Sequence, residues 1–539
     1  MMINKQIRLI LATCVLSTIA ACAPVDRWGA VQPDYEALLR RTGTPPIEIP
    51  EEVLPSMAQP VPLPVPAEGQ ALPLSVEEAI MISLQYNRDL HVRQLNPVIA
   101  GTFEQIARGV FDPEVFAEMQ YYRERASETS RATGEQFGTQ GSDTSVVAGV
   151  RQSLPTGTEL EATVEHERNL SNRTPDQQTA RVGLSVTQSL LRGFGPAVNM
   201  IDVRQAALDH SASLYELRGY IEALVADTEI AYWNYVLAEQ EIAIFENAAK
   251  VASQQRDEIE QRIAVGVLPR IEAAASRAEV ALREQALIDA RSQLESQRLR
   301  LVRLLGPGAA AGLDLQVRPT TGPAIDAQPI TDLPERLQLA EQARPDINEA
   351  RLRLQQDRLE VLVTKNGLLP RLELFAGLGR TGYADTFSQS VKELDGDTYD
   401  FTAGLRFSHF LGNRSAEARH VAARATRRQS AEAVANLLQI VRLDVHLAAT
   451  EVERTRQQIS ATAATRALQE QTLVAEKERF DVGASTSLLV AQAQRDLLTI
   501  QIAEVEAVIN YRTALVQLYL SEGSLLERRG IRLGDPQRP

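Results

Sequence analysis

Two hydrophobic periodicities alternate along this chain of 539 residues. Stretches with apolar residues every three or four positions predict amphipathic helices, and shorter stretches with apolar residues at every second position predict strands. Two helical runs are long and contain no proline, and at a rise of 1.5 Å per residue each would span about 100 Å. The predicted helices occupy residues 74–109, 197–264 and 269–305 in the first half, and 333–367, 414–481 and 485–520 in the second.

The alternating stretches predict four strands within residues 114–191 and two within 371–410. In the first of them, Val115, Ala117, Met119 and Tyr121 alternate with polar residues. Segments of about ten residues with this alternation are typical of membrane β-barrels, although a strand of a soluble sheet would show the same pattern. The polar stretches 126–144 and 381–398 are expected to form long loops outside the cell, and residues 154–158 a tight turn.

The order of helix, strands, long helix, tip and shorter return helix occurs twice. The first copy covers residues 74–310, a linker covers 311–332, and the second copy covers 333–520. Both begin with a helix-start signal, a Ser75/Glu78 capping box in one and Pro334 in the other. The tips, at 265–268 and 482–485, contain Val265, Gly266 and Val267, and Val482, Gly483 and Ala484. This internal two-fold repeat favours a tubular assembly over an enzyme pocket.

The N-terminus has the features of a secretory signal, because Lys5 and Arg8 accompany an apolar run too short to span a bilayer. Residues 19–22, Ile-Ala-Ala-Cys, resemble the lipobox of bacterial lipoproteins, which predicts a signal peptide at 1–21 and lipidation of Cys22. An ordinary signal with a chance cysteine is the alternative. Ala23 in place of aspartate favours sorting to the outer membrane. Residues 22–73 form a proline-rich arm or linker, and 521–539 a C-terminal tail.

Composition and motifs argue against an enzyme or a nucleic-acid-binding protein. The formal charge of −14 opposes phosphate binding. Neither a His-Glu-x-x-His nor a Gly-x-Ser-x-Gly sequence occurs, so no metal, cofactor or catalytic residue is predicted. Glu258 and Arg262 are best explained as an i,i+4 surface pair.

Taken together, these elements resemble the TolC family of outer-membrane efflux and secretion channels. The resemblance covers residues 74–520. It is carried by residues 74–79 (Leu-Ser-Val-Glu-Glu-Ala) with Asn87 and Leu90, by residues 190–195 (Leu-Leu-Arg-Gly-Phe-Gly), and by the two tips. It implies an α+β membrane protein that forms a homotrimer, with one shared β-barrel in outer-membrane lipid and one coiled-coil-like helical tunnel in the periplasm.

The resemblance also implies partners. In this family the tips meet a periplasmic adaptor (membrane fusion) protein, which joins the channel to an inner-membrane RND or ABC transporter. The chain would then be the passive exit duct of a tripartite efflux pump or of a type I secretion system. The alternative is a non-channel, coiled-coil structural or adhesive envelope lipoprotein, which would not need strands.

Two departures from the family pattern are expected to matter. Leu489 and Gln492 occupy the positions where acidic residues constrict the tunnel entrance in the best-known member, so apolar and amide side chains would close it here, with Asp481 as a nearby charge. Six predicted strands replace the usual four, which would make an eighteen-stranded rather than a twelve-stranded trimeric barrel. Alternatively, the extra hairpin around residues 154–158 packs elsewhere.

Overall fold

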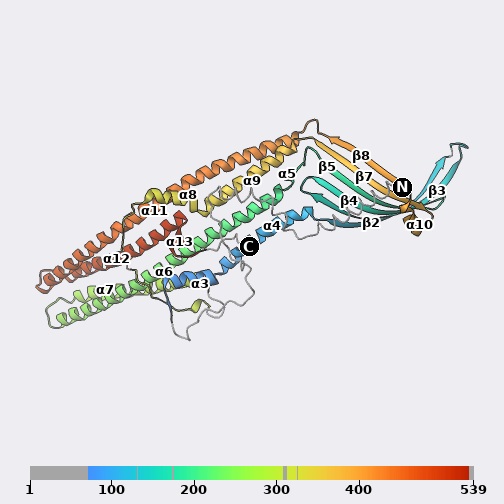
Figure 1. Ribbon diagram of the computed structural model, residues 1–539. Helices are drawn as coiled ribbons and strands as arrows, with labels where there is room; N and C mark the ends of the chain where they lie inside the picture. Colours follow the sequence, from blue (N-terminus) through green and yellow to red (C-terminus); the bar gives the residue numbers. More distant parts are fainter. Residues whose placement is uncertain (1–70, 130, 173–174, 307–311, 324–325, 533–539) are drawn as a thin grey trace. The chain divides into compact units, whose positions relative to one another are not determined.

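The computed structural model describes residues 71–129, 131–172, 175–306, 312–323 and 326–532, shown in Figure 1. All of them belong to one of the two units into which the chain divides, Ile49–Leu533. Among the described residues, none of the helices combines the length and apolarity that crossing a bilayer would require.

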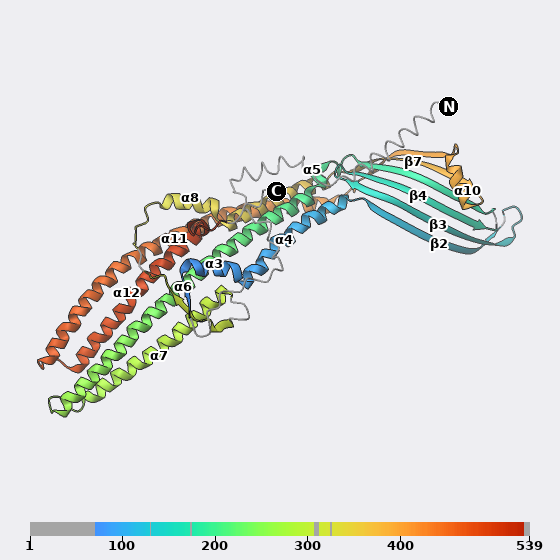
Figure 2. The same cartoon turned by 60° about the horizontal axis from the view of Figure 1, so that its bottom comes forward.

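The predicted helices are present, and the two long ones form hairpins with their return helices (Figure 2). α6 is a helix of 64 residues that packs along α7, and α11 is one of 68 residues that packs along α12. Shorter helices pack beside them, α4 on α6 and α9 on both α6 and α11. The helices are α3 (Val76–Tyr86), α4 (Arg88–Arg108), α5 (Pro196–Asn199), α6 (Ile201–Ala264), α7 (Glu272–Leu305), α8 (Leu333–Ala343), α9 (Pro345–Gly367), α10 (Phe387–Lys392), α11 (Arg414–Asp481), α12 (Ser487–Glu522) and α13 (Leu525–Arg528).

The sequence predicted one helix at the start of each copy, and that prediction was wrong in the same way twice. The first helix is interrupted at Asn87 and the second at Arg344, both in extended conformations. Asn87 accepts a hydrogen bond from the Leu90 amide and so caps the helix that follows. Arg344 precedes Pro345, and a residue before proline is driven out of the helical region.

Six strands form one antiparallel sheet in the order β2-β3-β4-β5-β7-β8. Four come from the first half of the chain and two from the second half, as predicted, and the extra hairpin belongs to the same sheet. The tight turn between β3 and β4 is also present, closed by the Gly157 amide on the Leu154 carbonyl at 2.9 Å. The strands are β2 (Glu114–Thr129), β3 (Gln136–Leu154), β4 (Thr158–Ser171), β5 (Gln177–Ser189), β7 (Arg371–Ala384) and β8 (Tyr399–Ser408). A separate parallel pair is formed by β1 (Leu72–Leu74) and β6 (Val317–Pro319).

The expected long loops are shorter than predicted, because much of each stretch belongs to regular elements. Residues 126–144 continue the β2–β3 ladder as far as the Thr129–Gln136 pair. Residues 381–398 contain the end of β7, the short helix α10 and a single 3₁₀ turn, Glu393–Asp395. Ladder hydrogen bonds join backbone groups, so strands can extend through polar sequence where no apolar face is required.

Two apolar clusters hold the helices together. The larger centres on the middle of α6, where Tyr232 and Trp233 are buried against α3, the end of α7 and the β1–β6 pair. The smaller joins α11 to α8, α9 and α12 around Val441, Val445 and Val452, each 0% exposed. These three valines are four and seven positions apart, the spacing of one apolar stripe along a helix.

Candidate functional site

The six-stranded sheet has one apolar and one polar face. Residues opposite each other in an antiparallel ladder point to the same side, so the register assigns every side chain to a face. The apolar face is exposed in the single chain, with Val115 80% and Phe407 65% accessible. Its exposed members include Val115, Met119, Val146, Val150, Val164, Val182, Leu184, Leu374, Leu378, Phe401, Leu405 and Phe407.

On the polar face, arginine side chains form ion pairs with carboxylates. Arg181 of β5 reaches over Gly379 of β7 to Asp400 of β8, with Nη2 2.8 Å from Oδ2, and also contacts Glu165 of β4 at 3.3 Å. A Cβ at residue 379 would lie 2.5 Å from the Asp400 carboxylate, so glycine makes room for this ion pair.

Two matching clusters lie on the same polar face. On β2 and β3, Arg151 pairs with Glu114 at 2.7 Å and lies 5.4 Å from the Phe116 ring centroid. On β7 and β8, Arg406 pairs with Glu373 at 3.3 Å and lies 5.4 Å from the Phe375 ring centroid. In each cluster the phenylalanine faces a glycine across the ladder, Gly149 in the first and Gly404 in the second. Cation–π contact and ion pairing therefore fix the same arrangement twice.

Both helical tips end in the same capping motif. The Val267 amide donates to the Arg262 carbonyl at 2.9 Å and the Gly266 amide to the Ile263 carbonyl at 3.0 Å. In the second tip, the Ala484 amide donates to the Arg479 carbonyl at 2.8 Å, and the Gly483 amide donates to the Phe480 carbonyl at 3.0 Å. This is the Schellman pattern, which needs a left-handed residue. Gly266 (φ 80°) and Gly483 (φ 76°) supply it.

The tips present small apolar side chains to solvent. Val265 and Val267 of the first tip are 75% and 68% exposed, and Val482 of the second is 79% exposed. Ala484 is exposed as well. The capped backbone holds these side chains at the ends of rigid helices.

Polar contacts connect the two hairpins near the tips. Arg262 of α6 bonds to Asp481, the last residue of α11, at 2.8 Å, and to Glu258 at 2.7 Å as the predicted i,i+4 pair. Its guanidinium also lies 5.5 Å from the Phe480 ring centroid. The Ser487 hydroxyl at the start of α12 donates to Glu272 at the start of α7.

The predicted entrance residues Leu489 and Gln492 lie in the first turns of α12, three positions apart, so they share a helix face. Leu489 is 47% exposed and Gln492 is exposed. The Asp481 carboxylate is engaged by Arg262.

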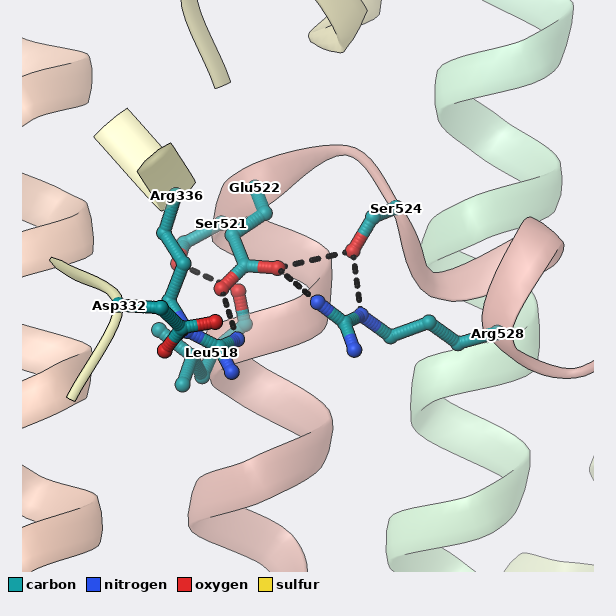
Figure 3. A network of polar contacts seen from close by, with 7 residues as sticks. All are labelled: Asp332, Arg336, Leu518, Ser521, Glu522, Ser524 and Arg528. Carbon is teal, nitrogen blue, oxygen red and sulfur yellow. Dashed lines mark hydrogen bonds and ion pairs between the residues drawn. The ribbon is translucent and has the colours of Figure 1, made fainter. Parts of the chain in front are cut away.

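A buried ionic network, drawn in Figure 3, links Glu522 at the end of α12 to Arg336 of α8 and to Arg528 of α13. Glu522, 0% exposed, receives hydrogen bonds from Arg336 at 2.6 Å and from the Ser524 hydroxyl at 2.9 Å. Arg528 approaches its second oxygen at 3.3 Å, and Arg336 also bonds to Asp332 at 2.7 Å. A buried carboxylate of this kind is tolerated only because its oxygens are satisfied by charged partners.

Two further carboxylates are buried in α6. Glu222 pairs with Arg218 at 3.0 Å, and Glu229 pairs with Arg529 of the tail segment. Burial raises the pKa of Glu222 to about 7, against the opposing effect of Arg218. Sequence reasoning missed Glu222, Glu229 and Glu522, although each is a carboxylate set among apolar helix positions, which is the signal that could have found them.

The predicted N-terminal features lie outside the described residues. Cys22, the signal peptide 1–21 and all but the last residues of the 22–73 arm are outside the described residues. In the described ranges, His, Cys, Asp and Glu side chains form no group suited to holding a metal ion.

Comparison with known proteins connects this geometry to a family. Residues 336–524 match the family described as Outer membrane efflux protein. The comparison with curated proteins gave no match.

Solved structures share the fold at low sequence identity. The CmeC outer membrane channel of Campylobacter jejuni is 15% identical, with 86% of this chain and 87% of that chain covered and a TM-score of 0.64. The outer membrane protein VceC of Vibrio cholerae is 17% identical, with 83% and 96% covered and a TM-score of 0.61. The MtrE outer membrane channel of Neisseria gonorrhoeae, in an open state, is 18% identical, with 86% and 91% covered and a TM-score of 0.59.

The family match covers the second copy of the helix–strand–helix order, and the shared fold extends over most of the chain. Over residues 336–524 the chain resembles the Outer membrane efflux protein family, and over most of its length it has the fold of solved outer membrane channels.

Proposed function

We propose that this protein is the exit duct of a tripartite efflux pump or type I secretion system. Three copies form one channel, with their strands in a shared outer-membrane barrel and their long helices in a shared periplasmic tunnel. The observation that carries this proposal is the sheet, which has one exposed apolar face and two unpaired edges, β2 and β8. Lipid provides no hydrogen bonds for open edges, so a spanning sheet must close on itself.

The strand number favours a wide, shared barrel. Six strands are fewer than the eight of the smallest membrane barrels, so one chain cannot close alone. β8 of one copy and β2 of the next run in opposite directions around the ring and can continue the antiparallel order. Three copies then make an eighteen-stranded barrel, a size that leaves an aqueous channel.

The tips are the proposed docking surface for a periplasmic adaptor protein. Val265, Val267 and Val482 are exposed apolar side chains on capped, rigid helix ends. Leu489 and Gln492 line the closed entrance, with Asp481 beside them. The pump, an RND or ABC transporter in the inner membrane, supplies the energy, and lipidation of Cys22 anchors the duct to the outer membrane.

The experiment is reconstitution of the purified full-length protein into planar bilayers, together with gel migration before and after heating. A channel gives discrete conductance steps and a trimer band that shifts on boiling. A non-channel coiled-coil lipoprotein gives neither, and that result would overturn the proposal. Electron microscopy of the trimer then counts strands, and twelve would contradict the wide barrel.

A further inference from the structure

The apolar face of the six-stranded sheet becomes cationic toward the end that is remote from the helices (Figure 1). On β2 this face carries Val115, Met119 and Tyr121, followed by two arginines, because alternate residues of a strand share a face. The ladder register places one arginine of β4 and one of β7 on the same face, and α10 adds a lysine. We call these five side chains the cationic band: Arg123, Arg125, Arg168, Arg380 and Lys392.

No strand carboxylate accompanies the cationic band. Every aspartate and glutamate within the six described strands stands on the opposite, polar face. Arg168 pairs at 2.7 Å with Asp176 of the β4–β5 loop, and its side chain is still 44% exposed. Arg123 and Arg125 are exposed as well. The apolar face therefore carries exposed positive charge for which the strands themselves supply no counterion.

The arginines of the band lie at one height on the sheet. Arg123, Arg168 and Arg380 are each nine or ten residues from the end of their strand that is closer to the helices. With a rise of about 3.4 Å per residue and a strand tilt of about 40°, this distance is about 25 Å along the bilayer normal, which equals the height of the apolar band on outer-membrane barrels. In a sheet that spans the membrane, these cations lie where the acyl chains end and the headgroups of the outer leaflet begin.

The short helix α10 lies on the apolar face just beyond Arg380 (Figure 2). A Cβ at residue 382 would overlap the backbone of α10, so Gly382 lets this helix approach β7 closely. The Phe387 ring meets His166 of β4 edge-on, with 4.8 Å between the ring centroids. Phe387 is nevertheless 56% exposed, and Lys392 in the last turn is exposed too. An apolar ring and a lysine on one short helix suit the membrane interface.

We infer that the cationic band binds phosphate groups carried by lipids of the outer leaflet. A guanidinium group can donate two parallel hydrogen bonds to one phosphate, which makes arginine well suited to an anionic headgroup. The phosphate belongs to a lipid rather than to a free ion, because the exposed apolar surface next to the band accommodates the acyl chains of the same molecule. The inference rests on the proposed channel function and gives the barrel a lipid ligand on its outer surface.

The test measures lipid binding by the purified full-length trimer in detergent, with native mass spectrometry as the readout. The probes are lipid A, a glycolipid that carries phosphate groups, and phosphatidylcholine, whose headgroup has no net charge. Each cation near the headgroups strengthens the binding of an anionic lipid about fivefold, so the wild-type trimer should prefer lipid A by at least about tenfold. A large excess of inorganic phosphate should not displace the bound lipid A.

Two double variants remove charge from different parts of the band. R123Q/R125Q does so on β2, and R380Q/K392Q does so on β7 and α10. Each should lower the affinity for lipid A about tenfold and leave the affinity for phosphatidylcholine unchanged. R123K/R125K keeps both charges and should retain most of the affinity for lipid A.

The matched control is R151Q/R406Q, which removes two charges from the polar face of the same sheet. Its affinity for lipid A should stay within about twofold of the wild-type value, because the polar face does not contact lipid. A similar loss in the control and in the band variants would mean that net charge, and not the band, determines binding, and would overturn the inference.

The remaining outcomes separate the inference from the function beneath it. A conducting trimer that binds lipid A no better than phosphatidylcholine overturns the inference alone, and so does displacement of lipid A by inorganic phosphate. If a double variant fails to form the heat-modifiable trimer, the single variants R123Q and K392Q decide, each with a smaller expected loss of affinity. Absence of any conductance from the wild-type trimer contradicts the proposed function instead.

Discussion

Arg262 near the end of α6 donates a hydrogen bond to Asp481, the last residue of α11, at 2.8 Å. The bond joins two helical hairpins that are separated by more than two hundred residues of sequence. Phe480 adds a cation–π contact to the same guanidinium. Because the pair sits beside the tips, it holds the two hairpins together at the end proposed as the tunnel entrance.

Arg262→Ala is expected to loosen the tips and favour an open entrance. Exposed ion pairs contribute up to about 1 kcal/mol, so the open fraction of a reconstituted channel should rise about three- to fivefold. Single-channel recording measures it. The control is Arg277→Ala, which removes the Arg277–Glu260 pair inside one hairpin. An equal response to both substitutions would contradict a specific link between hairpins.

Val482→Asp is expected to weaken docking of an adaptor without weakening the trimer. Val482 is 79% exposed, so a charge at its position stays in solvent and removes an apolar contact for a partner. Export through the assembled pump should fall about tenfold, while bilayer conductance stays at the wild-type level. Cross-linking in cells between the tip and the adaptor measures docking directly. Val474→Asp, on an exposed position farther back along α11, is the control. Normal cross-linking by the Val482 variant would remove this tip from the docking surface.

Glu222 makes local stability of the helices depend on pH. Burial raises its folded pKa to about 7 from 4.5. A carboxyl whose pKa is raised by folding contributes stability below its unfolded pKa, and that contribution is lost as pH rises through the folded value. The opening free energy of the surrounding helix should therefore fall by about 3 kcal/mol between about pH 4.5 and pH 8.

Hydrogen exchange of the amides around residue 222, corrected for the intrinsic pH dependence of exchange, tests this expectation. Glu222→Gln should remove most of the difference in opening free energy between acid and alkaline pH. Glu527→Gln, at the exposed partner of the same Arg218, should leave most of it. A difference that persists in Glu222→Gln would assign the pH dependence to another group.

The sequence predicted what local periodicity determines and missed what distant contacts determine. The helix 414–481 was predicted from its apolar spacing, and Val441, Val445 and Val452 on one stripe of it are fully buried. At the break, Asn87 caps the next helix locally and also donates its side-chain amide to the Leu304 carbonyl, more than two hundred positions away, a contact that no local pattern contains. Glu522 was missed for a similar reason, since its partner Arg336 comes from another helix.

The entrance residues make a prediction about block by trivalent cations. Leu489 and Gln492 carry no charge, and the Asp481 carboxylate is engaged by Arg262. Acid rings bind multivalent cations, and apolar constrictions do not. We expect weak block from the periplasmic side in planar bilayers. Strong block that Asp481→Ala abolishes would show that carboxylates guard the entrance after all.

Gly149 and Gly404, which face phenylalanines across the ladder, should differ in how well they tolerate substitution by alanine. A Cβ at residue 404 would lie 2.6 Å from the tip of the Phe375 ring, which can rotate away. A Cβ at residue 149 would lie 2.5 Å from the Ala162 carbonyl oxygen, a backbone atom of the neighbouring strand that cannot move without disturbing the ladder. Gly149→Ala should therefore destabilise the sheet by about 1–3 kcal/mol, and Gly404→Ala by less. The temperature at which the trimer dissociates on gels measures both. A larger loss for Gly404→Ala would mean that the Phe375 ring, held by Arg406, is the less yielding of the two neighbours.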